Sequence, residues 1–190
     1  MPLLVKAALA HVQFETIHPF LDGNGRVGRL LITLLFCVED ALAQPMLYLS
    51  LYFKKHRDAY YQLLQRVRTE GAWEAWLHFF LSGIIDTTEQ ATRTAQRILE
   101  LFREDRTRVE KLGRSAASAL RLHDAFKAHV VYSIPRAAKR LRLSQPTVTA
   151  AMKHLVKLGV VREMTGRRRS KVYAYHAYLK LLGEGAEPIK

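Results

Sequence analysis

Two segments with helical periodicity meet at the stretch His18-Pro-Phe-Leu-Asp-Gly-Asn-Gly-Arg-Val-Gly-Arg29. Residues 1–17 carry apolar side chains at helical spacing, and residues 26–38 contain a nearly unbroken apolar run that is typical of a buried helix. Pro19 disfavours helical geometry at His18, so the first helix is expected to end there. The sequence therefore predicts two helices joined by a short loop at the start of a mainly α fold.

This loop contains groups that bind phosphate. Gly23 and Gly25 flank Asn24 and can adopt backbone conformations closed to other residues, so that successive N–H groups can point at one anion. The N-terminus of the following helix adds the positive end of its dipole. Arg26 and Arg29 lie three residues apart on one face of that helix, and guanidinium groups bind phosphate oxygens in pairs. We therefore expect a phosphate site at this loop.

Two further side chains of the loop suit catalysis at a phosphate. Asp22 offers a hard oxygen ligand for a Mg²⁺ ion shared with phosphates. Histidine titrates near neutral pH, so His18 could remove a proton from an attacking hydroxyl group. The glycines also match parts of the dinucleotide fingerprint and the P-loop. Helical periodicity before the loop, and Arg29-Leu30 in place of Lys and Ser/Thr, exclude both motifs.

The whole stretch resembles the signature of the Fic family, His-Pro-Phe-x-(Asp/Glu)-Gly-Asn-Gly-Arg-x-x-Arg, at every defined position. The resemblance extends from Phe14 to Leu31, and more loosely to about residue 110. Fic enzymes mostly transfer AMP from ATP to a Ser, Thr or Tyr hydroxyl group of a protein, and their fold is all helical. The resemblance implies a general base at His18, a Mg²⁺ ligand at Asp22, an anion hole at Gly23, Asn24 and Gly25, and phosphate contacts from Arg26 and Arg29.

The resemblance also covers residues outside the signature. Phe20 resembles the residue that anchors the loop in the core. Tyr60 and Tyr61 resemble a tyrosine pair near the nucleotide base, and two amphipathic core aromatics would give the same pattern. Arg68 stands where several family members carry an asparagine on the same helix. That helix is expected from Leu51 to Arg68, followed by helices over residues 72–83 and 84–111.

Only 17 residues precede His18. Fic proteins of this type place further helices, a β-hairpin flap and often an inhibitory helix ahead of the signature. The resemblance therefore implies an N-terminally truncated Fic protein that transfers AMP poorly. It also predicts that the apolar faces of residues 1–17 and 26–38 are partly uncovered.

The net charge of +13 is concentrated in the last part of the chain. Residues 1–112 hold 14 Lys and Arg against 13 Asp and Glu, a difference of +1, whereas residues 113–190 hold 16 against 4, a difference of +12. This asymmetry predicts a domain over residues 1–112, carrying the Fic signature, and a second domain over residues 113–190 whose partner is a polyanion.

Residues 113–190 show a short alternation of helices and strands. Helices are expected at 120–126, 134–141 and 145–158, and strands at 130–132, 160–164 and 171–175. This order resembles the winged helix-turn-helix family, a small α+β fold. The resemblance implies contacts to duplex DNA from polar groups of the third helix and the basic hairpin tip: Gln145, Thr147, Thr149, Lys153, Arg167, Arg168, Arg169 and Lys171. A protein-binding domain of the same fold remains the alternative.

The remaining composition points to a cytoplasmic protein. The single cysteine, Cys37, can form no internal disulfide, no apolar run reaches the ~18–20 residues of a membrane span, and the first residues do not resemble a signal peptide. Pro45 is expected to interrupt the helical pattern. We therefore expect a protein adenylyltransferase that uses Mg²⁺ and ATP on a protein hydroxyl group. The competing hypothesis is a non-enzymatic DNA-binding regulator whose Fic part senses a nucleotide.

Overall fold

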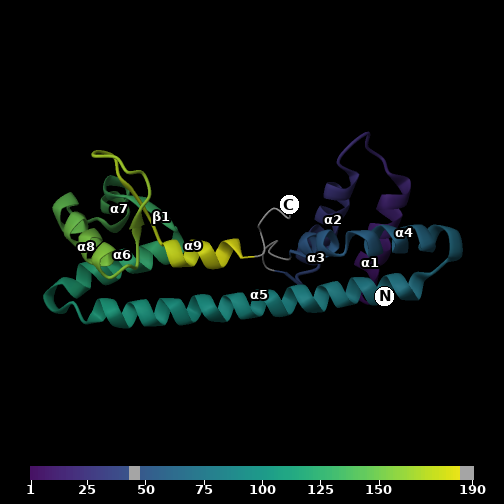
Figure 1. Cartoon of the computed structure of the whole chain (residues 1–190), viewed down its shortest axis with the longest axis horizontal. Coiled ribbons are helices and arrows are strands. Elements are labelled where there is room, and N and C mark those ends of the chain that lie inside the picture. Colours follow the sequence, from purple (N-terminus) through teal and green to yellow (C-terminus); the bar gives the residue numbers. More distant parts are fainter. Residues whose placement is uncertain (43–47, 185–190) are drawn as a thin grey trace. The chain divides into compact units, whose positions relative to one another are not determined.

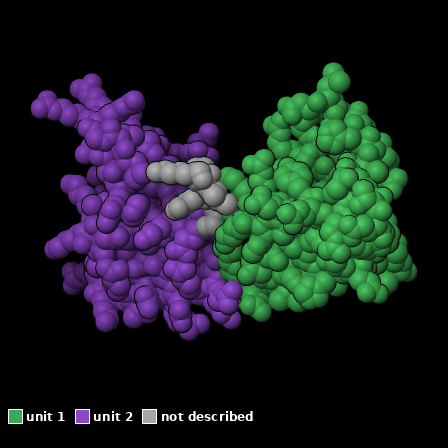
Figure 2. Space-filling model, turned by 45° about the vertical axis from the view of Figure 1, so that its right-hand side comes forward, with its two compact units in different colours: residues 1–92 green, residues 93–190 purple. Residues whose placement is uncertain are grey.

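The computed structural model describes residues 1–42 and 48–184, and these residues are mainly α-helical, as expected. The predicted break at Pro45 lies outside the described residues. The chain divides into two compact units, residues 1–92 (unit 1) and 93–190 (unit 2), which Figure 2 distinguishes by colour. No helix among the described residues has both the length and the apolar composition that crossing a membrane requires.

Unit 1 is built from helices (Figure 1). They are α1 (Leu3–Ile17), α2 (Asn24–Val38), α3 (Leu49–Lys55), α4 (Arg57–Glu70) and the first part of α5 (Trp73–Glu110). The α1 helix ends directly before His18, where Pro19 predicted its end, whereas α2 begins at Asn24, two residues earlier than expected, so that Asn24 and Gly25 belong to the helix. Its core includes Trp76, which is fully buried and donates a hydrogen bond from Nε1 to the carbonyl oxygen of Ala8 at 3.1 Å. This bond attaches α5 to α1.

The helices α1 and α2 form a hairpin that packs closely at Gly28. A Cβ atom at this position would lie 2.7 Å from Glu15 Oε1, 3.1 Å from the Phe14 ring and 3.2 Å from the His11 ring. Position 28 therefore needs glycine because the two helices are in contact there. The third glycine of the apparent dinucleotide fingerprint thus serves helix packing.

The helix expected from Leu51 to Arg68 is two helices, α3 and α4, separated at His56. His56 has φ −110° and ψ 39°, outside helical geometry. Residues seven apart on a straight helix are about 10 Å apart along its axis, whereas the ring centroids of Phe53 and Tyr60 are 4.8 Å apart. The break allows both rings to enter the same core. The α4 helix ends at Gly71, whose φ of 68° suits a glycine.

Unit 2 combines helices with a small sheet. It contains the rest of α5, a 3₁₀ turn (Gly113–Ser115), α6 (Ala116–Ala128), β1 (Val131–Ser133), α7 (Ile134–Leu141), α8 (Gln145–Lys157), β2 (Arg162–Glu163), β3 (Val172–Ala174) and α9 (His176–Gly183). The strands are antiparallel in the order β1-β3-β2, with Tyr173 opposite both Tyr132 and Glu163. The sequence did not predict α9. The winged-helix resemblance stays a prediction.

The last turns of α5 belong to unit 2. A buried carboxylate of α5, that of Asp105, binds a tyrosine of this unit. Asp105 is 3% exposed, accepts a hydrogen bond from Tyr175 Oη at 2.7 Å and pairs with Arg108 at 2.7 Å. Val109 is fully buried in the same core as Phe126 and Leu155. The division between the units therefore falls within α5. The expected division into a Fic domain over residues 1–112 and a second domain over residues 113–190 stays a prediction.

Candidate functional site

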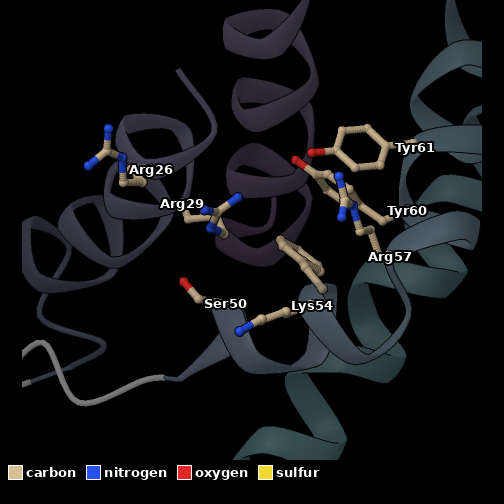
Figure 3. Close-up of a pocket in the computed structure, with 8 residues that line it drawn as sticks. Arg26, Arg29, Ser50, Lys54, Arg57, Tyr60 and Tyr61 are labelled. Atoms are coloured by element: carbon tan, nitrogen blue, oxygen red, sulfur yellow. The ribbon is translucent and has the colours of Figure 1, made fainter. Parts of the chain in front are cut away.

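A pocket of about 420 Å³ lies between α2, α3 and α4 (Figure 3). Its described lining has four cationic side chains and no carboxylate: Arg26, Arg29, Ser50, Phe53, Lys54, Arg57, Tyr60 and Tyr61. The positive charge favours an anionic ligand, and the volume falls within the range of small-molecule sites. Unit 1 therefore contains a basic pocket that begins at the predicted phosphate loop.

His18 lies directly after the last residue of α1. Its backbone is left-handed, with φ 49° and ψ 57°, and its N–H donates to the carbonyl oxygen of Phe14 at 3.0 Å. Its side chain is exposed to solvent. The imidazole is therefore accessible from solvent.

The loop from Phe20 to Asn24 is closed by the side chain of Asn24, which is 2% exposed. Its Oδ1 accepts from the Phe20 N–H at 2.9 Å, and its Nδ2 donates to the Phe20 carbonyl oxygen at 2.5 Å. The side chain of Asn24 is thus used inside the loop, and only its backbone N–H is placed to meet an anion. The Phe20 ring is 51% exposed, with its centroid 6.3 Å from that of Phe14. The expectation that Phe20 anchors the loop in the core is therefore wrong here, because Asn24 holds this loop through the backbone.

The start of α2 presents N–H groups that have no partner within the helix. Gly23 precedes it with φ 84°, and the N–H groups of Arg26 and Val27 both donate to the Gly23 carbonyl oxygen at 3.0 Å. The N–H groups of Asn24 and Gly25 come too early in the helix to have a carbonyl of α2 as partner. The anion hole expected at Gly23, Asn24 and Gly25 would use these two N–H groups, and this role stays a prediction.

The two arginines of the signature differ in their surroundings. Figure 3 shows the Arg26 guanidinium pointing away from the pocket centre and that of Arg29 pointing into it. The Arg26 side chain is 77% exposed, and its Nη2 lies 3.4 Å from Oδ2 of Asp22. A Cβ atom on Gly25 would lie 3.1 Å from Arg29 Nη1, so glycine leaves room for the Arg29 guanidinium at the start of α2. Arg29 is therefore the arginine already placed in the pocket.

Asp22 lies at the rim of this site. Its carboxylate is 93% exposed and accepts from the Gly23 N–H at 2.6 Å. No group of three or more His, Cys, Asp or Glu side chains that could hold a metal occurs among the described residues. One exposed carboxylate fits Mg²⁺, which usually binds through one or two carboxylates and the phosphates of a substrate.

A buried polar cluster, which the sequence did not predict, supports the pocket from behind. Tyr60 Oη lies 2.8 Å from His11 Nε2, and both residues are at most 3% exposed. Burial lowers the pKa of His11 to about 4 and raises the pKa of Tyr60. Burial also raises the pKa of Glu15, and the positive charge of Arg29 opposes this rise. All three pKa shifts are in the direction that favours the neutral form of the buried group.

The predicted tyrosine pair therefore divides between core and pocket. Tyr60 is a core residue whose edge lines the pocket, and Tyr61 is 54% exposed. The Arg57 guanidinium lies 5.7 Å from the centroid of the Tyr61 ring. Sequence reasoning missed Arg57, Lys54 and Ser50. The spacing of three and four residues between Arg57 and the two tyrosines would have placed all three on one helical face.

In unit 2 the predicted DNA contacts lie on α8 and on the connection between β2 and β3. Six of them are exposed: Gln145, Lys153, Arg167, Arg168, Arg169 and Lys171. Thr147 and Thr149 are half-buried, and their hydroxyl groups bond to Ser144 Oγ and the Gln145 carbonyl oxygen, both at 2.8 Å. These two threonines are thus partly engaged with the first turn of their own helix.

Comparison with known proteins connects this site to one family. Residues 1–36 match the Fic/DOC family. The protein adenylyltransferase Fic of Aedes aegypti is 39% identical over 84 residues, which cover 44% of this chain and 15% of that protein. A probable protein adenylyltransferase of Aquifex aeolicus is 54% identical over 37 residues, which cover 20% of this chain and 11% of that protein.

Among solved structures, a Fic family protein from Desulfovibrio desulfuricans G20 covers 92% of this chain, with 50% of its own chain matched. Its TM-score is 0.49 and its sequence identity 22%. The chain spans only 15% and 11% of the lengths of the two curated relatives. The family match covers the loop and both helices that hold the site, so this part of the chain is similar to the Fic/DOC family.

Proposed function

We propose that the pocket of unit 1 binds ATP and that the protein transfers AMP to a hydroxyl group of another protein. The observation that carries this proposal is the placement of Arg29. Its guanidinium points into a basic pocket at the same helix start where the Asn24 and Gly25 N–H groups lack helical partners. Two N–H donors, a helix dipole and a guanidinium favour the phosphates of a nucleotide. The relatives named protein adenylyltransferases support this ligand and this reaction.

In the proposed reaction His18 acts as the general base. It takes the proton of the acceptor hydroxyl group, whose oxygen forms a bond to the α-phosphorus of ATP. The bond from that phosphorus to the bridging oxygen breaks, and pyrophosphate leaves. The N–H groups of Asn24 and Gly25 and the guanidiniums of Arg26 and Arg29 hold the negative charge of the phosphates during this exchange. Tyr60 and Tyr61 border the part of the pocket that would hold the nucleoside.

Asp22 would hold Mg²⁺ together with phosphate oxygens. The bound ion would neutralise part of the triphosphate charge. The Asp22 carboxylate also lies against Arg26 and the Gly23 N–H. Binding of the ion would therefore compete with these contacts.

The proposal predicts that the purified protein transfers label from α-labelled ATP to protein. The label should be retained after denaturing electrophoresis, and γ-labelled ATP should give none, because the β- and γ-phosphates leave. Chelation of Mg²⁺ should abolish the labelling. Unlabelled protein in the presence of measurable ATP binding would contradict transfer and support the alternative of a regulator that senses a nucleotide.

A second proposed function is binding of duplex DNA by residues 113–190. The difference of +12 between basic and acidic residues in this segment supports it. So does the exposure of Arg167, Arg168 and Arg169, which lie between β2 and β3. Exposed guanidiniums neutralise DNA phosphates and release counterions.

We predict that the full chain binds duplex DNA with strong salt dependence. Changing Arg167, Arg168 and Arg169 to glutamine should reduce the slope of log K against log salt by roughly 2–3, about 0.9 for each DNA phosphate that the variant no longer neutralises. Arg66→Gln, which neutralises an exposed arginine of unit 1, is the matched control and should leave the slope unchanged. Binding that is undetectable or independent of salt would favour a protein partner for this unit.

A further inference from the structure

Arg68 connects α4 with the last turn of α1. Its Nη2 donates to the carbonyl oxygen of Glu15 at 2.6 Å, and its Nε donates to Thr16 Oγ1 at 3.3 Å. The first of these bonds joins residues 53 positions apart in the sequence. Arg68 is not among the residues that line the described part of the pocket. Its contacts are therefore with the helix that precedes His18.

The contact satisfies a carbonyl group that the helix itself leaves open. The last four carbonyl groups of an α-helix have no intrahelical partner, and basic side chains often supply one. In α1 the Phe14 carbonyl accepts from the N–H of His18 at 3.0 Å, and the next carbonyl, that of Glu15, accepts from Arg68. Two successive carbonyl groups at this end are thus bound by different donors. One of the donors is the backbone of His18 itself.

The same turn also packs against α2. The Glu15 side chain is 6% exposed, and its Oε1 lies so close to Gly28 that a Cβ atom there would be 2.7 Å away. Glu15 therefore accepts a hydrogen bond from α4 through its carbonyl group, while its side chain is packed against α2. His18 follows three residues later.

The backbone of His18 needs such support. A residue other than glycine with φ of 49° lies in a conformation that costs about 1–3 kcal/mol and persists only when its surroundings impose it. The end of α1 also determines where the imidazole lies relative to the pocket. The α4 helix carries Arg57, Tyr60 and Tyr61 on the pocket wall, so the helix that borders the nucleotide also holds the end of α1.

We propose that Arg68 is a positioning residue for His18, an inference that rests on the proposed transfer of AMP. By binding the Glu15 carbonyl group, Arg68 fixes the end of α1 and holds the imidazole where it can reach the acceptor hydroxyl group. It acts on the chemical step through His18. It does not contact the nucleotide.

The test compares Arg68→Met, which keeps an unbranched side chain that packs like the arginine stem but cannot donate hydrogen bonds, with Arg68→Lys and the control Arg66→Gln. Arg66 is exposed, lies on the same helix and pairs with Glu70 at 3.0 Å. Two quantities are measured: kcat and KM for ATP in the transfer assay, and hydrogen exchange of the backbone amides of Thr16, Ile17, His18 and Phe20. The exchange measurement does not depend on activity.

For Arg68→Met we expect kcat to fall by about 10- to 100-fold, as for a misplaced catalytic group. KM for ATP should change by less than about threefold. Amide exchange at Thr16, Ile17, His18 and Phe20 should become faster. Arg68→Lys should restore part of kcat, because one ammonium group can still reach the Glu15 carbonyl, and Arg66→Gln should match the wild type. If Arg68→Met does not fold, the same readouts on Arg68→Lys decide the question.

Three results would overturn the assignment. They are an unchanged exchange rate in Arg68→Met, a KM that rises while kcat stays constant, and a loss of kcat of the same size in Arg66→Gln. If the wild-type protein binds ATP but transfers no AMP, the proposed function fails. The exchange measurement then still decides whether Arg68 holds the end of α1.

Discussion

His18→Ala is expected to lower the rate of AMP transfer by about 10²–10⁴-fold, the usual contribution of a general base. ATP binding should be nearly unchanged, because the described lining of the pocket comes from α2, α3 and α4 and does not include His18. Alanine removes the proton acceptor but retains an L-residue at the left-handed position, so the folded state should be little affected. The measurement is kcat with α-labelled ATP, together with ATP affinity by calorimetry.

His78→Ala is the matched control for this experiment. His78 is also an exposed histidine of unit 1. It lies on α5, whose residues do not appear in the described lining of the pocket. Its replacement should leave transfer at the wild-type rate. Normal transfer by His18→Ala would show that another group removes the proton.

Acid is expected to destabilise unit 1 strongly, because His11 is buried in its neutral form. Burial lowers the pKa of His11 from 6.5 to about 4. The unfolded chain therefore binds a proton at a higher pH than the folded chain does. The stability that the neutral imidazole provides is complete above pH 6.5 and is lost as the pH falls from 6.5 towards 4. Over this window the loss amounts to about 3 kcal/mol.

The other titratable group of the cluster acts in the opposite direction. Burial raises the pKa of Glu15 above its usual value of 4.5. Its contribution to stability is therefore complete below pH 4.5 and is lost as the pH rises through the raised value. Tyr60 stays protonated throughout this range because burial raises its pKa. His11 and Glu15 thus set the pH dependence of this cluster.

Urea unfolding at pH 7.5, 6 and 4.5 measures this effect, and His11→Gln provides the comparison. Glutamine can still form a hydrogen bond to the Tyr60 hydroxyl group, but it does not titrate. The variant should therefore lose less stability on acidification. At pH 7.5 it should be less stable than the wild type, because the buried imidazole ring is lost. Burial also lowers the pKa of His123 in unit 2 to about 4. A probe in unit 1, such as fluorescence of Trp76, is therefore needed to separate the two units. Equal acid sensitivity of His11→Gln and the wild type would contradict the assignment to His11.

The sequence predicted the loop and its two helices because each is marked by local chemistry. Pro19 ends one helix, Gly23 adopts a backbone conformation that favours glycine, and the apolar run from Leu30 fits a helix. The break between α3 and α4 at His56 has no local signal in the sequence, because neither proline nor glycine occurs there. We attribute it to the packing of Phe53 against Tyr60. Tertiary contacts determine such a helix break. The hydrophobic periodicity of one segment does not reveal these contacts.

The candidate site shows the same division. The signature predicted the residues at the start of α2, but nothing local indicated that the Asn24 side chain closes its own loop. His11 and Glu15 are polar residues whose burial follows only from the packing of α1 against α2 and α4. The sequence marked Arg68 only as the residue that stands where several family members carry an asparagine. Its bond to α1 depends on how the two helices are placed.

At His18 the residue that best fits the backbone differs from the residue that the proposed reaction needs. Glycine and asparagine adopt φ near 49° more readily than histidine does, so either would fit the backbone better. Neither can take the proton of a hydroxyl group. A lineage that no longer needed the reaction could therefore gain folding free energy by exchanging this residue. In a related chain with an otherwise complete signature, a glycine or asparagine at this position would mark a domain that still binds nucleotides but no longer transfers AMP.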